Sequence, residues 1–472
     1  MSRETDNFHE DNEIIEALQR YEEMLETGEM YYFDVYQLEH IVDNYIEIGK
    51  LIPALRVIDL GLKQHPSSIN ILVKKADVLV NLGESESALA LINHLLTIEE
   101  TNPDLHLLKG TAYLDLGKQE QAEDSFRDFK RYSFDDKVET NYSIGSAYEQ
   151  CGDYKGAIDY FQEAHELDQK HEAVLYELAY CYEKVGEDYK CIQYYNKYLD
   201  LDPYSDTAWF NMGIIYNRLG SPRKAVEAYE FAVTINEDFP NAWYNLGNTY
   251  IQWKKFDKAI YALTKYLEFE DTNDEIYCMI GDCLVQLKKY NLAFDFYQKS
   301  LVYNKNNDRA WFGSGIIMKF KADFHAAYGY FKKAVKLDEN NSDYWFLLAK
   351  VSQKLDLFDE TTEAYRNACA LAPGRLYGWL RYADLVYQKG LLVRAIAILE
   401  SALQYHPLNS LVLYRLAAYN LRTLNEKNAV KHLKKALSID YNHHFYLFES
   451  YPEAQLSDSV KKLILKYKKI NS

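Results

Sequence analysis

The feature that most constrains this chain is a pattern of about 34 residues that occurs twice in succession between Asp206 and Asn273. Both copies carry residues of matched character at seven fixed offsets. The first copy holds Trp209, Met212, Gly213, Tyr216, Ala225, Tyr229 and Ala232, and the second holds Trp243, Leu246, Gly247, Tyr250, Ala259, Leu263 and Tyr266. Self-similarity at a fixed period indicates one structural unit that recurs along the chain.

The register set by these two copies extends in both directions. Earlier copies start at Val35, Ile69, Pro103, Val138 and Glu172, and later copies start at Asp274, Asp308, Ser342, Leu376 and Ser410. Twelve repeats result, from Val35 to His443, and only one needs an extra residue, near Phe134–Lys137. A small residue is expected where two helices cross: Ala54, Ala88, Ala122, Ala157, Cys191, Ala225, Ala259, Ala293, Ala327, Thr361, Ala395 and Ala429.

The residues at these offsets match the pattern W-x2-L-G-x2-Y…A-x3-F, so the chain resembles the tetratricopeptide-repeat family. The resemblance implies an all-α fold, a right-handed α-solenoid superhelix of helix-turn-helix repeats in which each pair buries its apolar face against its neighbours. Composition agrees, because the 472 residues include only 20 Gly and 9 Pro, and helical repeats need few breakers.

The segments outside the repeats are expected to cover the two ends of the stack. Residues 1–34 are predicted to form a disordered tip, over residues 1–10, and an N-terminal capping helix; residues 35–443 form the repeats. Residues 444–472 are predicted to form a proline-marked turn and a C-terminal capping helix. That last helix carries Val460, Leu463, Ile464 and Tyr467 on one face and lysines on the other, which favours a cap over contact with a membrane or an acidic partner.

Charge and composition exclude several classes of function. The formal net charge is −18, which disfavours nucleic acid and anionic membrane surfaces as partners. The N-terminal residues resemble no export signal, and no stretch approaches the roughly 18 apolar residues of a membrane span, so we expect a cytoplasmic protein. The six cysteines show no paired spacing and are interpreted as reduced packing residues.

No residue pattern in the chain supports catalysis, a cofactor or a metal. The segment from Gly110 to Lys118 has the wrong glycine spacing for a phosphate loop, and Gln119 stands where Ser or Thr is needed. His165-Glu166 and His171-Glu172 are not followed by a second His at the spacing of a zinc peptidase, and the adjacent pair His443 and His444 at the end of the array is not expected to bind a metal. We therefore predict that the protein is not an enzyme.

The resemblance also implies where a partner binds. In this family the first helix of each pair lines a concave groove, and the fifth residue of the repeat points into it. That offset holds Glu39, Val73, Leu107, Tyr142, Tyr176, Phe210, Tyr244, Cys278, Phe312, Phe346, Leu380 and Tyr414. Six of the seven from Tyr142 to Phe346 are aromatic. These rings either anchor a partner or pack against the next helix, and the sequence leaves both interpretations open.

The groove is predicted to bind a protein or peptide. The candidate binding residues are Tyr142, Tyr176, Phe210, Tyr244, Asn248, Phe312, Phe346, Tyr414, Arg218, Arg309 and Lys350. The positions that flank this offset are acidic in the first third of the array. Later in the array they are mixed to basic, with Lys319, Lys354 and Arg422 in addition to Arg218, Arg309 and Lys350. A partner with one basic and one acidic end would therefore bind in a single orientation. The carboxylate clamp known in this family is disfavoured, because only Asn245 occupies a matching position.

Two functions follow as hypotheses. The first is a non-enzymatic scaffold or adaptor that binds a protein segment in the concave groove. The alternative is a structural assembly subunit that associates through its ends or its convex face. The oligomeric state is left open by the sequence.

Overall fold

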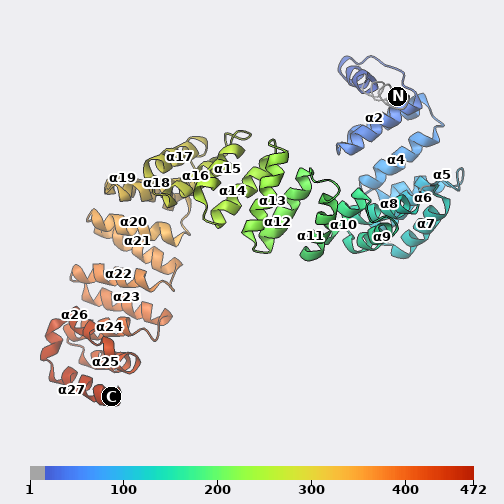
Figure 1. Cartoon of the computed structure of the whole chain (residues 1–472). Coiled ribbons are helices and arrows are strands. Elements are labelled where there is room, and N and C mark those ends of the chain that lie inside the picture. The colour runs from blue at the N-terminus through green and yellow to red at the C-terminus, as the bar shows by residue number, and fades with distance from the viewer. Residues whose placement is uncertain (1–15, 135, 472) are drawn as a thin grey trace. The chain divides into compact units, whose positions relative to one another are not determined.

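The computed structural model describes residues 16–134 and 136–471, except for the side chains of residues 456 and 469–471. All regular secondary structure in these residues is helical, and the chain divides into two units at the boundary between Phe239 and Pro240 (Figure 1). The tip predicted to be disordered, residues 1–10, lies outside the described residues.

Unit 1 begins with a helix that includes residues 16–27 and continues with six helix pairs. The pairs are α2 (Val35–Glu47) with α3 (Leu51–Gln64), α4 (Ile69–Asn81) with α5 (Ser85–Leu95), α6 (Pro103–Asp115) with α7 (Gln119–Tyr132), α8 (Lys137–Gln150) with α9 (Tyr154–Leu167), α10 (Glu172–Lys184) with α11 (Asp188–Leu199), and α12 (Asp206–Arg218) with α13 (Pro222–Ile235).

Unit 2 contains six further pairs in its described residues, which are followed by two 3-10 helices, the short helix α26 and the longer helix α27. The pairs are α14 (Pro240–Gln252) with α15 (Phe256–Tyr266), α16 (Asp274–Gln286) with α17 (Tyr290–Tyr303), α18 (Asp308–Phe320) with α19 (Phe324–Leu337), α20 (Ser342–Lys354) with α21 (Phe358–Leu371), α22 (Leu376–Gln388) with α23 (Leu392–Tyr405), and α24 (Ser410–Arg422) with α25 (Glu426–Ile439). The end segments are η1 (Tyr441–His443), α26 (Phe445–Ser450), η2 (Pro452–Leu456) and α27 (Asp458–Asn471).

The helix boundaries confirm the predicted repeats. Among the described residues, eleven of the twelve first helices begin at the predicted start, and the other, α8, begins at Lys137 instead of Val138. The small residue predicted for each helix crossing is buried in all twelve pairs. The all-α, repeated-pair architecture is therefore confirmed.

Each pair is held by a close approach between its two helices. In six repeats the eighth residue is glycine, and a Cβ atom added there would lie 2.3–2.7 Å from the side chain sixteen residues later in the chain. In the pair α16–α17 the glycine is Gly281 and the facing ring is Tyr297, which is almost fully buried. The glycine of the sequence pattern is thus required because a side chain of the second helix occupies the space that its Cβ would fill.

In four repeats the tryptophan of the pattern ties the preceding loop to the helix that contains it. The indole nitrogens of Trp209, Trp311, Trp345 and Trp379 each donate a hydrogen bond to the carbonyl oxygen six residues earlier, over distances of 2.8–3.0 Å. These carbonyl groups lie between a second helix and the next first helix, where no helical partner reaches them. The bond therefore sets the angle at which one repeat enters the next.

The turn inside each pair passes through left-handed backbone at the fifteenth residue of the repeat, where φ lies between 57° and 79°. Unit 1 has glycine at all six of these positions. Unit 2 has glycine only at Gly390; the other five positions hold Lys254, Lys288, Ala322, Asp356 and Leu424. A residue with a Cβ atom in this conformation is disfavoured by roughly 1–2 kcal/mol, so the turns of unit 2 are the more strained.

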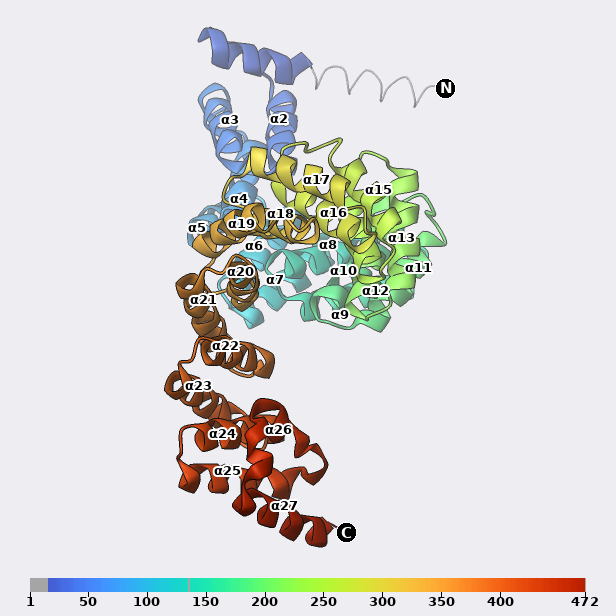
Figure 2. The ribbon, with the colours of Figure 1, turned by 90° about the vertical axis from the view of Figure 1, so that its left-hand side faces the viewer.

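The C-terminal helices pack against the last pair of unit 2. Helix α26 contacts α24 and helix α27 contacts α25 (Figure 2). Val460 is buried, and Leu463, Ile464 and Tyr467 pack against the same core. Lys461, Lys462, Lys466 and Lys468 are exposed.

We predict that replacing Gly281 with Ala destabilises unit 2, because the added Cβ would lie 2.6 Å from the Tyr297 ring. Overpacking of this kind costs about 1–3 kcal/mol, and thermal unfolding followed by circular dichroism would show a lower midpoint. Gly329→Ala is the matched control, since nothing lies within 4 Å of its added Cβ and the residue is inside helix α19. That substitution is expected to raise stability. Equal effects of the two substitutions would contradict the packing argument.

Candidate functional site

The first helices of successive pairs form a layer of their own in each unit. Helix α2 contacts α4, α4 contacts α6 and α6 contacts α8 in unit 1, and α16 contacts α18 in unit 2. Each second helix packs against the first helix of its own pair. The surface of the first helices that is turned away from the second helices is called here the first-helix face.

The first-helix face of unit 2 contains a cavity of about 630 Å³. It lies mainly between α14 and α16, and its lining residues include Tyr244, Asn248, Ile251 and Gln252 from α14, Glu275, Met279, Asp282, Cys283 and Gln286 from α16, and Arg309 from α18. Lys254 and Phe256, at the turn into α15, complete the wall. This volume falls within the range of about 300–1,000 Å³ that is usual for ligand pockets.

Asp282 fixes the geometry of the wall on the α18 side. Arg309 donates a hydrogen bond of 2.8 Å from Nη2 to Asp282 Oδ2, and the Tyr297 hydroxyl donates one of 2.6 Å to Asp282 Oδ1. Helices α16, α17 and α18 are therefore joined at one carboxylate. Because both its oxygens are engaged, Asp282 orients the wall instead of acting as a free base.

Apart from the charged residues Glu275 and Lys254, the rest of the wall consists mainly of apolar and amide side chains. Met279 is half-buried and supplies a flexible thioether. Cys283 is buried, and burial raises the pKa of its thiol to about 12, so it remains protonated and contributes as an apolar group. Asn248 and Gln286 present amides that can both donate and accept hydrogen bonds.

Three of the predicted binding residues come together at this cavity. Tyr244, Asn248 and Arg309 all line it, and the Tyr244 side chain is 36% exposed. Its ring also packs against Tyr266, at 5.7 Å between ring centres. Met279 and Gln286, the sixth and thirteenth residues of their repeat, also line the cavity but were not predicted from the sequence.

The other predicted aromatic residues of unit 2 differ in exposure. Phe312 is half-buried and packs 4.5 Å from the Tyr344 ring, measured between ring centres. Phe346 is also half-buried, and the exposed Lys350 ammonium lies 5.7 Å from its ring centre. Both rings thus contribute to packing and also keep part of their surface on the first-helix face.

Tyr414 was wrongly predicted as a binding residue. Its side chain is fully buried, and its hydroxyl donates a hydrogen bond of 2.6 Å to the backbone oxygen of Asp440. The ring therefore belongs to the core that joins α24 to the end of α25, and it has no surface to offer a partner.

In unit 1 the predicted rings Tyr142, Tyr176 and Phe210 are half-buried, and each contacts another ring. Arg218 is engaged within the unit, since its Nε donates a hydrogen bond of 3.0 Å to Asp188. Contact between these four residues and a partner stays a prediction.

Comparison with known families identifies the repeat. Two sequence models of the tetratricopeptide repeat match six successive segments of the chain: residues 103–136, 138–171, 173–205, 206–239, 240–273 and 274–307. These segments correspond to the helix pairs from α6–α7 to α16–α17. The chain belongs to the tetratricopeptide-repeat family. In general, such repeats serve as scaffolds for protein–protein interaction.

Solved structures similar to this tetratricopeptide-repeat (TPR) protein include MamA, with 22% identity over 37% of this chain and 94% of that chain and a TM-score of 0.34. YrrB, described as a TPR protein with an unusual peptide-binding site, has 18% identity over 39% of this chain and 95% of its own, with a TM-score of 0.34. A chain of the APC/C hetero-tetramer Cut9–Hcn1 has 17% identity over 92% of this chain and 95% of its own, with a TM-score of 0.36. The comparison with curated proteins gives no match.

Two further properties of the TPR array bear on the site. Across the described residues, no group of three or more His, Cys, Asp or Glu side chains is placed to hold a metal ion. Within the same residues, no helix is long and apolar enough to cross a membrane.

An unusual pair of acids lies on the first helices of unit 1. Glu149 of α8 and Glu177 of α10 lie close enough for their carboxyl groups to interact, and the charge of Lys184 acts on Glu149. Burial and then the charge of Glu149 raise the pKa of Glu177 from 4.5 to about 8. One proton is therefore shared between the two carboxyl groups at neutral pH.

This pair predicts a pH dependence of stability in the TPR array. The folded state holds a proton on Glu177 that the unfolded state has released, so the stabilisation is complete below about pH 4.5 and is lost as pH rises to about 8. Glu177→Gln imitates the protonated carboxyl group, so the variant should not show the loss of stability between about pH 4.5 and pH 8 that is due to Glu177. The measurement is the melting temperature between pH 5 and pH 9; identical pH profiles for the two proteins would contradict the assignment.

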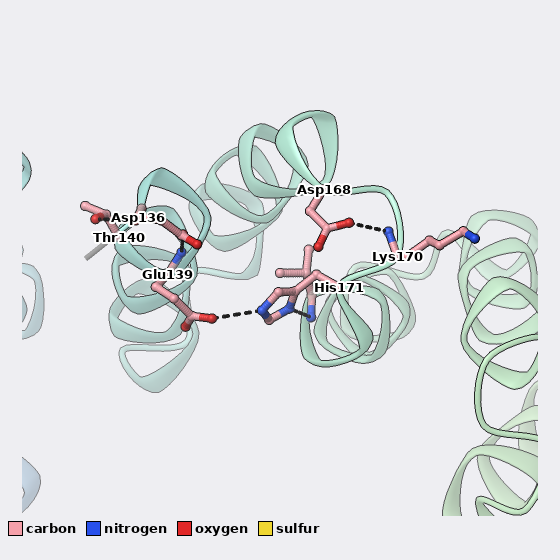
Figure 3. Close-up of polar contacts among 7 residues, drawn as sticks. Asp136, Glu139, Thr140, Asp168, Lys170 and His171 are labelled. Carbon is pink, nitrogen blue, oxygen red and sulfur yellow. Dashed lines mark hydrogen bonds and ion pairs between the residues drawn. The ribbon is translucent and has the colours of Figure 1, made fainter.

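His171 joins the same two helices at the other end of α10 (Figure 3). Its Nδ1 accepts a hydrogen bond of 3.3 Å from the backbone of Val174, and its Nε2 lies 2.9 Å from Glu139 of α8. The first bond requires an unprotonated Nδ1, so Nε2 is the donor to Glu139. His171 occupies the helix-capping position that Ser205 and Asn273 occupy in other repeats.

We predict that His171→Ala lowers stability by about 1 kcal/mol or more, through loss of the cap, together with the bond to Glu139. His171→Asn keeps a capping side chain of the kind used elsewhere in the chain and should lose less. Hydrogen exchange at the Val174 amide measures the cap directly: exchange should accelerate in the alanine variant and remain slow in the asparagine variant. Slow exchange in both would show that the cap does not hold this turn.

Proposed function

We propose that this TPR protein is a non-enzymatic scaffold that binds an extended segment of a partner protein along the first-helix face of unit 2. The observation that carries the proposal is the cavity of about 630 Å³, where Tyr244, Asn248 and Arg309 meet. The general role of the family in protein–protein interaction agrees with it.

The composition of the cavity suits a peptide. Ile251, Met279 and Cys283 provide an apolar wall for one side chain. Asn248 and Gln286 can pair with the N–H and C=O groups of a peptide backbone, because an amide donates and accepts. Tyr244 adds an amphipathic ring of the kind that anchors interfaces. An extended chain satisfies both the apolar and the amide groups at once.

The same residues are poorly suited to catalysis. The Cys283 thiol is protonated at neutral pH, and Asp282 is engaged by both Arg309 and Tyr297. An activated nucleophile needs a base within hydrogen-bonding distance that is free to accept its proton. This arrangement supports a binding role for the cavity.

The test fills the cavity without touching the core. Asn248 is half-buried and lines the cavity, so Asn248→Trp should occupy the space and reduce partner binding at least tenfold while helical content is unchanged. Partners are captured from native lysate by the wild-type protein, and synthetic peptides that cover each captured sequence are then titrated by fluorescence anisotropy.

The matched control is Asn291→Trp, which adds the same ring at an exposed position of the second helix α17. It should bind the peptides as well as the wild-type protein does. The proposal is wrong if Asn248→Trp binds them with unchanged affinity, or if both tryptophan variants lose binding to the same extent.

A further inference from the structure

A second cavity of unit 2, of about 580 Å³, lies on the first-helix face between α22 and α24. Its lining includes three residues of α22, at the ninth, twelfth and thirteenth positions of their repeat, and four of α24, at the second, sixth, tenth and thirteenth positions. All of these positions also line the cavity between α14 and α16. The two cavities are therefore the same kind of inter-helix site in different pairs of repeats.

The cavity between α22 and α24 differs in that the chain itself covers it. Residues 445–456, which form α26 and η2, are called here the cover segment. Five residues of this segment complete the wall of the cavity: Tyr446, Glu449, Ser450, Pro452 and Glu453. Helix α26 contacts α24 (Figure 2), and the Tyr387 hydroxyl of α22 donates a hydrogen bond of 3.4 Å to the backbone oxygen of Ser450. The cover segment thus contacts both first helices.

The end of the helix stack is covered by a different helix. Helix α27 contacts α25, the second helix of the last pair, and its Val460 is buried. Inside the array the first helix of the next repeat makes this contact, as α24 does with α23. Because α27 caps the last pair, the position of the cover segment on the first helices is not explained by capping.

A run of stacked groups joins the cover segment to the first helices. The Tyr387 ring lies parallel to the Tyr419 ring, with 4.4 Å between ring centres. Arg422 Cζ lies 5.3 Å from the centre of the Tyr387 ring and 5.7 Å from the centre of the Tyr451 ring in the cover segment. Tyr451 has a non-helical backbone (φ −153°, ψ 88°), because Pro452 follows it and disfavours the helical region. The contact therefore uses an aromatic residue that a proline holds in position.

The cover segment is attached at a few points only. Leu447 and Ala454 are buried, whereas Glu449 and Pro452 are exposed. The cavity of about 580 Å³ remains between the segment and the helices. Atoms that border such a space lack contacts on one side, so separating the segment from the helices costs less free energy than unfolding a fully packed pair.

We propose that the cover segment is an internal ligand of a second binding surface, formed by α22 and α24, and that a partner segment with an aromatic residue followed by proline replaces it there. This surface is formed by different helices from the site between α14 and α16. A tethered ligand acts at a high effective concentration, so the partner binds weakly until the cover segment is displaced.

The test releases the cover segment and supplies it again as a separate peptide. Leu447→Asp places a charge at a fully buried position and should detach the segment. The probe is a fluorescein-labelled peptide with the native sequence of residues 444–457, titrated against the full-length proteins by fluorescence anisotropy. The Leu447→Asp protein should bind it at least tenfold more tightly than the wild-type protein does, because the tethered competitor is gone. Equal affinities would overturn the inference.

Two substitutions test the recognition of the aromatic residue. Tyr451→Ala in the peptide, or Arg422→Ala added to the Leu447→Asp protein, should weaken binding at least tenfold, because each removes a member of the stacked run. The matched control is Arg366→Ala, which removes an exposed arginine from the second helix α21 and should leave the affinity unchanged. Binding that is indifferent to both Tyr451 and Arg422 would contradict the proposed contact.

Hydrogen exchange in the wild-type protein tests the opening without any substitution, and it decides the matter if Leu447→Asp does not fold. The Tyr451 amide donates a hydrogen bond of 2.9 Å to the backbone oxygen of Leu447. It should exchange at least tenfold faster than the amides in the middle of α24, because the cover segment opens independently. Equal exchange rates would show that the segment opens only with the last pair and would overturn the inference.

The remaining outcomes separate this surface from the site between α14 and α16 and from self-association. Asn248→Trp, added to the Leu447→Asp protein, should leave the affinity for the probe unchanged. Loss of binding in that variant would locate the probe between α14 and α16, which overturns the inference and leaves the proposed function standing. A wild-type dimer in light scattering that Leu447→Asp abolishes would assign the surface to the cover segment of a second copy, and would overturn the assignment to a different partner.

Discussion

The structure depends on how closely the two helices of a pair approach each other. The buried small residue of the second helix and the glycine of the first, exemplified by Gly281, allow a ring such as Tyr297 to lie directly on the opposing backbone. A pair of this kind cannot bury its apolar surface alone, so it must stack on the next. Within each unit the stacking brings first helices together in a layer, and the first-helix face is a consequence of that layer.

The surface of unit 2 that we propose as a binding site consists of residues that the packing of the helices leaves free to vary. Positions that face the second helix are small or aromatic in repeat after repeat, whereas the positions turned outward vary from Asn248 to Asp282 to Lys350. Three carboxylates of unit 2 are paired with an arginine of the next repeat: Asp282 with Arg309, Asp343 with Arg375, and Asp384 with Arg415. The first of these pairs holds the wall of the cavity in place and leaves its amides and apolar atoms available.

Much of the fold could be predicted because the 34-residue period carries its own register. Eleven first helices start where the sequence pattern places them. The exposure of individual side chains could not be predicted, because it depends on the neighbouring helix and not on the offset. Tyr244 and Tyr414 share one offset, yet the first is 36% exposed and the second is covered by the chain around Asp440. Met279 and Gln286 also line the cavity, but a methionine and a glutamine at these positions match no sequence motif that would predict a binding site.

Lys254 belongs both to the strained turn between α14 and α15 and to the rim of the cavity. A residue with a Cβ atom is disfavoured in this conformation by roughly 1–2 kcal/mol, so the rim of the cavity includes a strained turn. Unit 1, with glycine at every such turn, carries none of this strain. Glycine in place of Lys254 would relieve the strain and also remove a cation from the rim, so one residue sets both the stability of the turn and part of the charge of the cavity.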